Sequence, residues 1–399
     1  IYVPAGSVDA YKAKEYWSEY KDYIFAEGVE SESANDEIWY TNGRTTGPTE
    51  PYNPDAFGDA TIQSNTYNAK KECWVIKFDK DLTEIGESAF WNCTSLTSVT
   101  IPDSVTTIGE SAFDWCYSLT SVTIGDSVTT IGDKAFYKCN SLTSVTIPDS
   151  VTTIGEKAFS ECGSLTSVTI GNSVTTIGEY AFWACFELTS VTIGNSVTTI
   201  GNHAFYYCTS LTSVTIPDSV TTIEESAFDW CTSLASVTIG DSVTTIGDYA
   251  FRGCDSLTSV TIPDRVKTIG YEAFRDCDSL ASVTIGNSVT TIGDGAFSWC
   301  GSITSVTIGD SVTTIGVDAF RSCDLTSVTI PDSVTTIGNG AFYNCYSLAT
   351  VYCKPTTPPT GGRDMFYNNA SGRKIYVPAG SAHAYKEKEY WSMYADYIF

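Results

Sequence analysis

The chain has 399 residues, with 22 basic residues (Lys and Arg) against 47 acidic ones, for a formal net charge of −25. A charge of this sign and size repels phosphate backbones and anionic lipid headgroups, which argues against nucleic acid as a partner. The sequence has no run of eighteen apolar residues, so we expect no membrane insertion. It opens on IYVPAGS, without a Met or an apolar leader, so we expect it to be cut from a longer protein.

Residues 1–25 are a near copy of residues 375–399, with identical residues at 20 of 25 positions. We interpret the first copy as the C-terminal cap of a preceding repeat block. Its aromatic positions lack repeat coils of their own to cover, so we expect deletion of 1–25 to leave the main unfolding transition within about 1 kcal/mol. Residues 26–72 differ in composition, with an acidic run, an apolar stretch at 38–40 and turn-rich sequence before 61–67. We predict an acidic linker and a small N-terminal β cap there.

From residue 96 the sequence LTSVTIPDSVTTIGESAFDWCYS returns about every 23 residues with few changes. Repeats of this length are typical of solenoids, because one unit is too small to bury its own apolar face. Leu96, Val99 and Ile101 alternate with outward Ser98 and Thr100, which predicts a short strand. We therefore predict an α/β solenoid over residues 73–353. It is a right-handed stack of 23-residue coils with about 14 parallel strands, the first of them at residue 73.

Each coil continues the apolar wall with a second pair, such as Val105 and Ile108, and a glycine then ends it. For the remaining segment of the coil, such as residues 110–116, we predict a turn of α-helix or 3₁₀ helix on the convex side. A C-terminal region follows over 354–399, with a proline-rich loop, a closing strand at 375–378 and an amphipathic capping helix. The helix would bury the apolar positions of the tail, which are Tyr385, Tyr390, Trp391, Tyr394 and Ile398.

One cysteine recurs at the same place in every coil. Zinc ligands are usually two to four residues apart, whereas these cysteines are 22 or 23 positions apart along the chain. Stacking would bring neighbouring cysteines within disulfide reach, but pairing would distort alternate coils. We predict a ladder of buried free thiols that act as small hydrophobic groups. The ladder contains Cys93, Cys116, Cys139, Cys162, Cys185, Cys208, Cys231, Cys254, Cys277, Cys300, Cys323 and Cys345.

With these motifs the chain resembles the BspA-like leucine-rich repeat proteins over essentially its whole length. The resemblance rests on AFxxCxxLTSVTIPDSVTTIG, on PYNPDAFG at 51–58, on VYCKPTTPP at 351–359 and on the two terminal IYVPAGS segments. It implies a secreted or surface-displayed protein of host-associated bacteria or parasitic protozoa, and some members of the family are adhesins for host matrix proteins. It implies no catalytic residues.

The two residues between the AF pair and the cysteine of each coil vary most. An aromatic residue stands there in eight of twelve coils, and an arginine in three of the other four. Trp, Tyr and Arg are enriched in binding hot spots, so one interpretation is a recognition stripe. The other is packing, because coils with the aromatic second have a small or acidic residue first. The candidate partner-binding residues are Trp91, Trp115, Tyr137, Trp183, Tyr206, Tyr207, Trp230, Arg252, Arg275, Trp299, Arg321 and Tyr343.

Three further patterns give no indication of a catalytic or metal site. GDSV at 125–128, 240–243 and 309–312 resembles an esterase nucleophile block, but the chain has only two histidines and neither stands nearby. Acidic residues also recur from coil to coil without a calcium-loop motif, so we expect solvated edges and no metal site. Five cations gather in the later coils, where we predict a neutral to basic patch; they are Arg252, Arg265, Lys267, Arg275 and Arg321.

We conclude from the sequence that this is a non-catalytic, cell-surface or secreted protein without cofactors. We predict an adhesin or recognition module for a host or neighbouring-cell macromolecule, either a matrix-type protein or a glycan. A passive spacer in a tandem surface array is one alternative, and a glycan-binding module is another.

Overall fold

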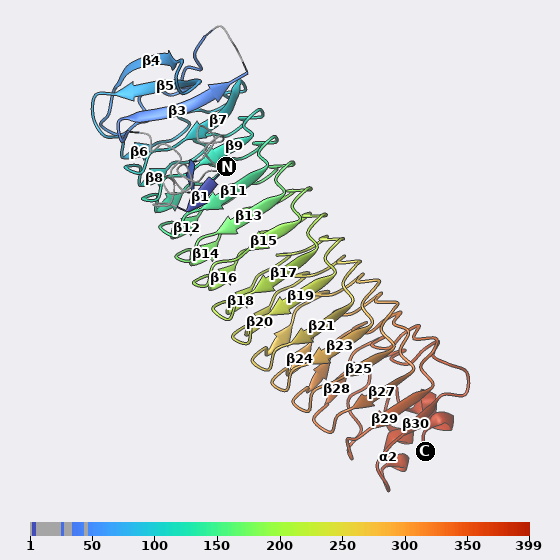
Figure 1. Cartoon of the computed structure of the whole chain (residues 1–399). Coiled ribbons are helices and arrows are strands. Elements are labelled where there is room, and N and C mark those ends of the chain that lie inside the picture. The colour runs from blue at the N-terminus through green and yellow to red at the C-terminus, as the bar shows by residue number, and fades with distance from the viewer. Residues whose placement is uncertain (1, 5–24, 28–33, 44–46) are drawn as a thin grey trace, which may run out of the picture.

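The computed structural model describes residues 2–4, 25–27, 34–43 and 47–399. Residues 34–43 and 47–399 form an elongated solenoid with a cap at each end (Figure 1). Near the N-terminus, β1 (Tyr2–Pro4) and β2 (Phe25–Glu27) pair in parallel, and Tyr2 stands opposite Phe25. The same offset of 23 residues joins Ile375 to Ile398 in the C-terminal cap. The aromatic face predicted within residues 1–25 lies outside the described residues.

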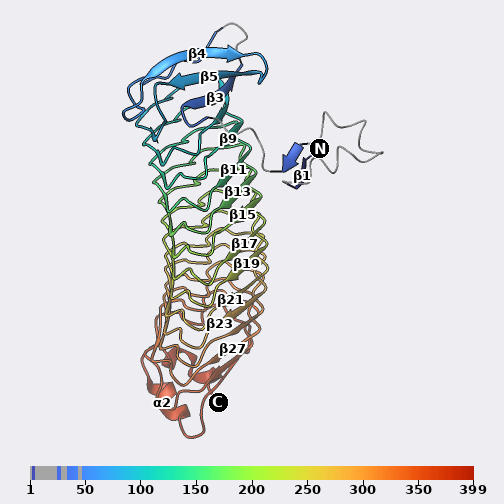
Figure 2. The ribbon, with the colours of Figure 1, turned by 60° about the vertical axis from the view of Figure 1, so that its left-hand side comes forward.

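The N-terminal cap is a small antiparallel sheet of β3 (Glu37–Asn42), β4 (Ile62–Asn68) and β5 (Cys73–Phe78). Its strand β3 also pairs antiparallel with β7 (Leu96–Thr100), so the cap covers the open edge of the solenoid (Figure 2). The prediction of a parallel repeat strand at residue 73 is therefore wrong. Because β3 lies between β5 and β7, β5 belongs to the cap sheet. In the described residues, the row of repeat strands that the sequence predicted therefore has thirteen members instead of fourteen.

The first face of the solenoid consists of these thirteen strands, one per coil, with inward apolar and outward hydroxyl side chains. Identical positions face each other between coils, as Ser144 faces Ser167 and Val145 faces Val168. After β7, the strands are β9 (Ser121–Thr123), β11 (Ser144–Ile147), β13 (Ser167–Ile170), β15 (Ser190–Thr192), β17 (Ser213–Ile216), β19 (Ser236–Ile239), β21 (Ser259–Ile262), β23 (Ser282–Ile285), β25 (Ser305–Thr307), β27 (Ser327–Ile330), β29 (Thr350–Cys353) and β30 (Lys374–Tyr376).

A second face is a continuous sheet of twelve two-residue strands, where the sequence predicted only an apolar pair. In each strand the isoleucine points into the core. The strands are β6 (Glu84–Ile85), β8 (Thr107–Ile108), β10 (Thr130–Ile131), β12 (Thr153–Ile154), β14 (Thr176–Ile177), β16 (Thr199–Ile200), β18 (Thr222–Ile223), β20 (Thr245–Ile246), β22 (Thr268–Ile269), β24 (Thr291–Ile292), β26 (Thr314–Ile315) and β28 (Thr336–Ile337).

The third side of each coil, which the sequence analysis called convex and for which we keep that name, carries tight turns, so the prediction of helix over residues 110–116 is wrong. Alternate amides there bond to the next coil: Phe90 N–H donates to the carbonyl of Ala112, and Asn92 N–H to that of Asp114, both at 2.7 Å. An α-helix needs its amides to bond along the chain, so this ladder between coils replaces it. The turns place non-glycine residues in left-handed geometry, such as Trp115 at φ 63°.

Two ladders fill the core. The phenylalanines from Phe90 to Phe366 stack with ring centroids 5.1 to 5.4 Å apart and nearly parallel planes. Beside them the cysteines are buried, as predicted. The thiol of Cys116 donates to the carbonyl of Phe90 at 3.1 Å, and the other coils repeat this bond. In the last coil Asn369 takes the cysteine position, and its Nδ2 donates to the carbonyl of Phe342 at 2.8 Å.

The C-terminal cap contains α2 (Ala382–Glu387) and the 3₁₀ helix η2 (Ser392–Tyr397), so the single helix predicted for the tail is divided in two. The backbone becomes extended at Lys388, which ends α2. Tyr385 and Trp391 are buried and donate to the carbonyls of Pro355 and Pro359 at 2.7 and 2.9 Å. Tyr390, which we predicted to be inward, is 37 % exposed. Within the described residues, none of the helices is long and apolar enough to cross a membrane.

Candidate functional site: a convex stripe with a notch

The twelve candidate residues lie on the convex side of the solenoid and follow the buried phenylalanine of each coil. Because the phenylalanines stack in register, the residues after them also align from coil to coil. We call the position directly after the phenylalanine the first row and the next position, before the cysteine, the second row. Both rows together form the convex stripe, which contains all twelve predicted residues.

Most side chains of the stripe pack against neighbouring coils, and two of the predicted ones are exposed. Ten of the twelve predicted side chains are half-buried against neighbouring coils. Trp230 shows how: a side-chain carbon added at Gly253 would lie 3.0 Å from the indole, so the ring covers the next coil. Tyr207 and Trp299 are the exceptions, with 37 % and 45 % of their surface exposed.

In the first third of the stripe, cations and aromatic rings alternate. The ammonium group of Lys138 lies 4.6 Å from the ring centre of Trp115 and 5.1 Å from that of Tyr137. The hydroxyl of Tyr137 donates to Glu161 at 2.6 Å. Trp91, at the start of the stripe, packs edge-on against Tyr52 of the N-terminal cap, with centroids 4.9 Å apart.

The middle of the stripe is a continuous aromatic cluster. Tyr180 stacks on His203 at 4.5 Å, and His203 contacts Tyr206 at 5.4 Å. Tyr206 in turn contacts Tyr207 at 4.3 Å, and Tyr207 stacks on Trp230 at 6.3 Å. The sequence analysis did not assign Tyr180 and His203 to this cluster, because they precede the AF pair and not the cysteine. Their row becomes a neighbour only through the left-handed turns.

Two buried carboxylates lie under the stripe in the first row, at Asp114 and Asp229. The guanidinium of Arg252, one coil further, forms two hydrogen bonds with Asp229, at 3.0 and 2.7 Å. Burial raises the pKa of the Asp229 carboxyl, and Arg252 opposes that shift. Asp114 has no arginine at the corresponding place, and burial raises its pKa to about 6. The only sequence signal for these acids was that an acidic residue preceded the second-row tryptophan.

The predicted basic patch does not form as one surface. Arg252, Arg275 and Arg321 belong to the stripe, and each is paired with an acid: Asp229, Glu272 and Asp318. Arg265 and Lys267 lie in the turn between β21 and β22, which is a different part of the coil. The prediction that the five cations form one patch is thus wrong. The charges of the three arginines in the stripe are neutralised by neighbouring acids.

A notch interrupts the stripe in the coil of residues 293–300. Here Gly295 precedes the AF pair and Ser298 occupies the first row, and none of the other eleven coils has such small residues at both positions. The neighbouring coils carry Glu272 with Arg275 on one side and Asp318 with Arg321 on the other. The result is a cavity of about 250 Å³ lined by Tyr271, Glu272, Arg275, Asp294, Gly295, Ser298, Trp299, Val317, Asp318 and Arg321.

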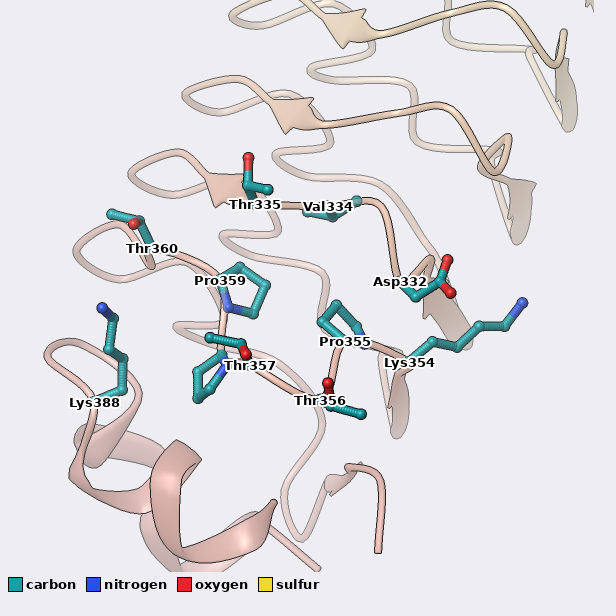
Figure 3. Close-up of a pocket in the computed structure, with 11 residues that line it drawn as sticks. Asp332, Val334, Thr335, Lys354, Pro355, Thr356, Thr357, Pro359, Thr360 and Lys388 are labelled. Carbon is teal, nitrogen blue, oxygen red and sulfur yellow. The ribbon is translucent and has the colours of Figure 1, made fainter. Parts of the chain in front are cut away.

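A second cavity, of about 570 Å³, lies beside the proline-rich loop at the C-terminal cap. The sequence analysis placed the loop but not the cavity. It forms because the loop of residues 354–360 replaces the regular turn of a coil below Thr335. Lys354 and Lys388 lie at its opposite ends, with prolines and threonines between them (Figure 3). The residues that line it present no cluster of charges, and none of the predicted site residues contributes to it.

Among the residues that the structure describes, no group of three or more His, Cys, Asp or Glu side chains has the arrangement of a metal site. His203 and His383 lie far apart in the fold, one in the aromatic cluster of the stripe and the other in α2. No described hydrogen bond joins either histidine to a serine of the GDSV segments.

Comparison with known proteins relates the chain to bacterial repeat proteins. The profile of the BspA type leucine-rich repeat region matches in six copies, over residues 60–189, 175–301 and 290–387. The chain is similar to a leucine-rich repeat protein from Bacteroides ovatus ATCC 8483. The two sequences are 28 % identical, the match covers 90 % of this chain and 97 % of that one, and the TM-score is 0.61. It is also similar to a leucine-rich cell surface protein from Faecalibacterium prausnitzii A2-165. These two sequences are 32 % identical, the match covers 81 % of this chain and 89 % of that one, and the TM-score is 0.48. No curated protein matches the chain.

Proposed function

Since the chain belongs to the BspA-type leucine-rich repeat family, we propose that it is a non-catalytic recognition protein. In this proposal it is secreted or displayed on a cell surface. It binds a macromolecule of a host or a neighbouring cell, of the matrix-protein or glycan type, through the convex stripe. The excess of 25 negative charges favours partners other than nucleic acid.

The observation that carries the proposal is the aromatic cluster from Tyr180 to Trp230. Its rings are held against one another from coil to coil, so binding would cost little side-chain entropy. Tyr207 presents 37 % of its surface beside half-buried neighbours, which is the usual setting of a hot spot. By contrast, the outward lane of the first face repeats Ser and Thr in most coils and offers few such anchors.

The test is a binding screen of the full chain against extracellular-matrix proteins and a glycan array. A partner found there should lose at least about tenfold in affinity when Tyr207→Ala and Trp230→Ala are combined, the scale of a hot spot. The matched control is Tyr67→Ala in the N-terminal cap, since Tyr67 is 53 % exposed and lies outside the stripe. Thermal unfolding of each variant separates loss of binding from loss of fold.

A passive spacer is the second candidate, because the uniform register of the coils supports one long body of constant cross-section. The same screen distinguishes the two. A spacer has no saturable partner in either panel, and the Tyr207 and Trp230 substitutions then have no binding to weaken.

A further inference from the structure

We propose that the notch at Gly295 and Ser298 is a binding site for one uncharged sugar ring of a glycan. This inference deepens the proposed recognition function and rests on it, since it assigns a ligand class to one part of the convex stripe. The site consists of the cavity of about 250 Å³ between the coils that carry Arg275 and Arg321.

The shape of the notch follows from a break in the repeat. In the coils on either side, the residue before the AF pair and the first-row residue form an ion pair, Glu272 with Arg275 and Asp318 with Arg321. The middle coil has glycine and serine at these positions and so has no side chains to fill the space. Gly295 is also needed for the packing, because a side-chain carbon there would lie 2.9 Å from Cγ of Glu272.

The chemistry of the walls favours a neutral polyhydroxyl ligand. Arg275 and Arg321 each use one Nη in the described bond to their acid, at 2.7 and 3.3 Å, and both side chains remain more than one-third exposed. The second Nη group of each arginine has no described partner and can act as a donor, whereas both Nε atoms are buried and that of Arg275 lies 3.3 Å from Asp276. Asp294 and Asp318 offer carboxylate oxygens as acceptors. A sugar hydroxyl donates and accepts, so it can satisfy both kinds of group.

Charge argues against ionic ligands in the same place. The lining holds two guanidinium groups and three carboxylates, from Glu272, Asp294 and Asp318. An anionic group would face three like charges, and both guanidinium groups already have an acid as partner. A cationic group would face the two guanidinium groups and would find only Asp294 without an ion pair, and Oδ1 of Asp294 already accepts from Val317 N–H at 2.7 Å. An uncharged ring avoids both penalties while still using the hydrogen-bonding capacity of the walls.

The rim of the notch supplies an apolar surface for the C–H face of a sugar. Trp299 is 45 % exposed and Tyr271 41 %, and both border the cavity. Their rings combine a broad apolar face with a polar edge, which suits a ligand that has one apolar and one polar side. The volume admits a single ring, so we expect a longer glycan to place one residue in the notch and to leave along the stripe.

The experiment is a glycan array of neutral and acidic oligosaccharides probed with the full chain, followed by calorimetric titration of the bound glycans. We expect neutral glycans to bind. The affinity should fall at least about tenfold in Ser298→Arg, which fills the notch with the residue found in both adjacent coils, and in Trp299→Ala, which removes the rim. Two controls outside the stripe should bind as the parent does: Ser121→Arg, at an exposed position of β9 on the first face, and Tyr67→Ala in the N-terminal cap.

Three results would overturn the inference: an array without a neutral binder, binding confined to acidic glycans, or neutral binding that survives Ser298→Arg. If thermal unfolding shows that Ser298→Arg does not fold, the affinity of Trp299→Ala for neutral glycans alone tests the inference. None of these results bears on the proposed function as long as a matrix protein binds and depends on Tyr207 and Trp230. The proposed function fails separately, when no partner in either panel responds to those two substitutions.

Discussion

Arg252 holds the carboxylate of Asp229 with two parallel hydrogen bonds, although the Asp229 side chain is only 1 % exposed. The pair joins adjacent coils, because the two residues are 23 positions apart and both occupy the first row. Removal of the cation would leave a buried charge without compensation. The pair therefore links the chemistry of the stripe to the stability of the solenoid.

We predict that Arg252→Met lowers the free energy of unfolding at pH 7 by about 3 kcal/mol, the usual cost of breaking a buried pair. Arg321→Met is the matched control, because Asp318 is 35 % exposed and its pair is worth less than about 1 kcal/mol. Urea unfolding of both variants measures the difference. Equal losses in the two variants would contradict a special role for burial at Asp229, and adding Asp229→Leu to Arg252→Met should recover most of the loss.

Asp114 should make stability fall as the pH rises. Burial raises the pKa of its carboxyl from an ordinary value near 3.8 to about 6, so the folded state binds this proton more tightly than the unfolded state. The favourable contribution is complete below about pH 4 and is lost between about pH 4 and 6. Asp114→Asn should remove this slope and raise stability at pH 7 by up to about 3 kcal/mol, because a difference of one in pKa corresponds to about 1.4 kcal/mol. The measurement is the difference between D114N and the parent in urea unfolding from pH 3.5 to 7.5; a constant difference would refute the prediction.

Lys134 should be replaceable by glycine with a gain in stability. It has a left-handed φ of 54°, which costs a residue with a side chain about 1 kcal/mol. Lys134→Gly removes that cost, less the added flexibility of the unfolded chain, for a net gain of up to about 1 kcal/mol. Lys134→Ala keeps the Cβ atom and should bring no gain, which makes it the control at the same position. Thermal unfolding that ranks alanine at or above glycine would contradict the argument.

The cysteine ladder should be unreactive in the folded protein. Burial raises the pKa of Cys185 to about 12 and moves the pKa of its neighbours in the same direction, so almost no thiolate is present at pH 8. A thiol reagent should label no ladder cysteine under native conditions and all fourteen cysteines of the chain after denaturation without reductant. Substantially fewer than fourteen labelled thiols would reveal disulfides, and rapid native labelling would contradict the burial.

The sequence predicted the features that recur, and it was less informative where each feature depends on a neighbouring coil. The period, the inward positions of the strand and the buried cysteines follow from spacing alone. The convex turns did not, because apolar spacing such as that of Ala112 and Phe113 is compatible with both a helix and a bonded turn, and only hydrogen bonds between coils decide. Likewise, the strand at Cys73 fits the repeat pattern, yet its pairing depends on β3, which comes from a distant part of the sequence.

The sequence predicted which positions line the stripe, but not which of their side chains are exposed or where the notch lies. Variation after the AF pair pointed to the twelve residues of the stripe. Whether a ring is exposed depends on the size of its neighbour one coil away, as Gly253 beneath Trp230 shows. The notch was visible in principle as the coincidence of Gly295 and Ser298, but its walls are recognisable only once the three coils are aligned.

The coil that follows Cys323 is one residue shorter than the others, and yet on the second face Thr314 still faces Thr336 and Ile315 still faces Ile337. The second-face sheet and the phenylalanine ladder thus continue across the shortened turn, although the first-face strands β25 and β27 are not paired there. Whole coils are therefore interchangeable parts. Recombination between copies of the repeat within the gene can lengthen or shorten the rod in steps of one coil, without a new interface and without a change to either cap. The reach of the protein can evolve independently of the stripe that it carries.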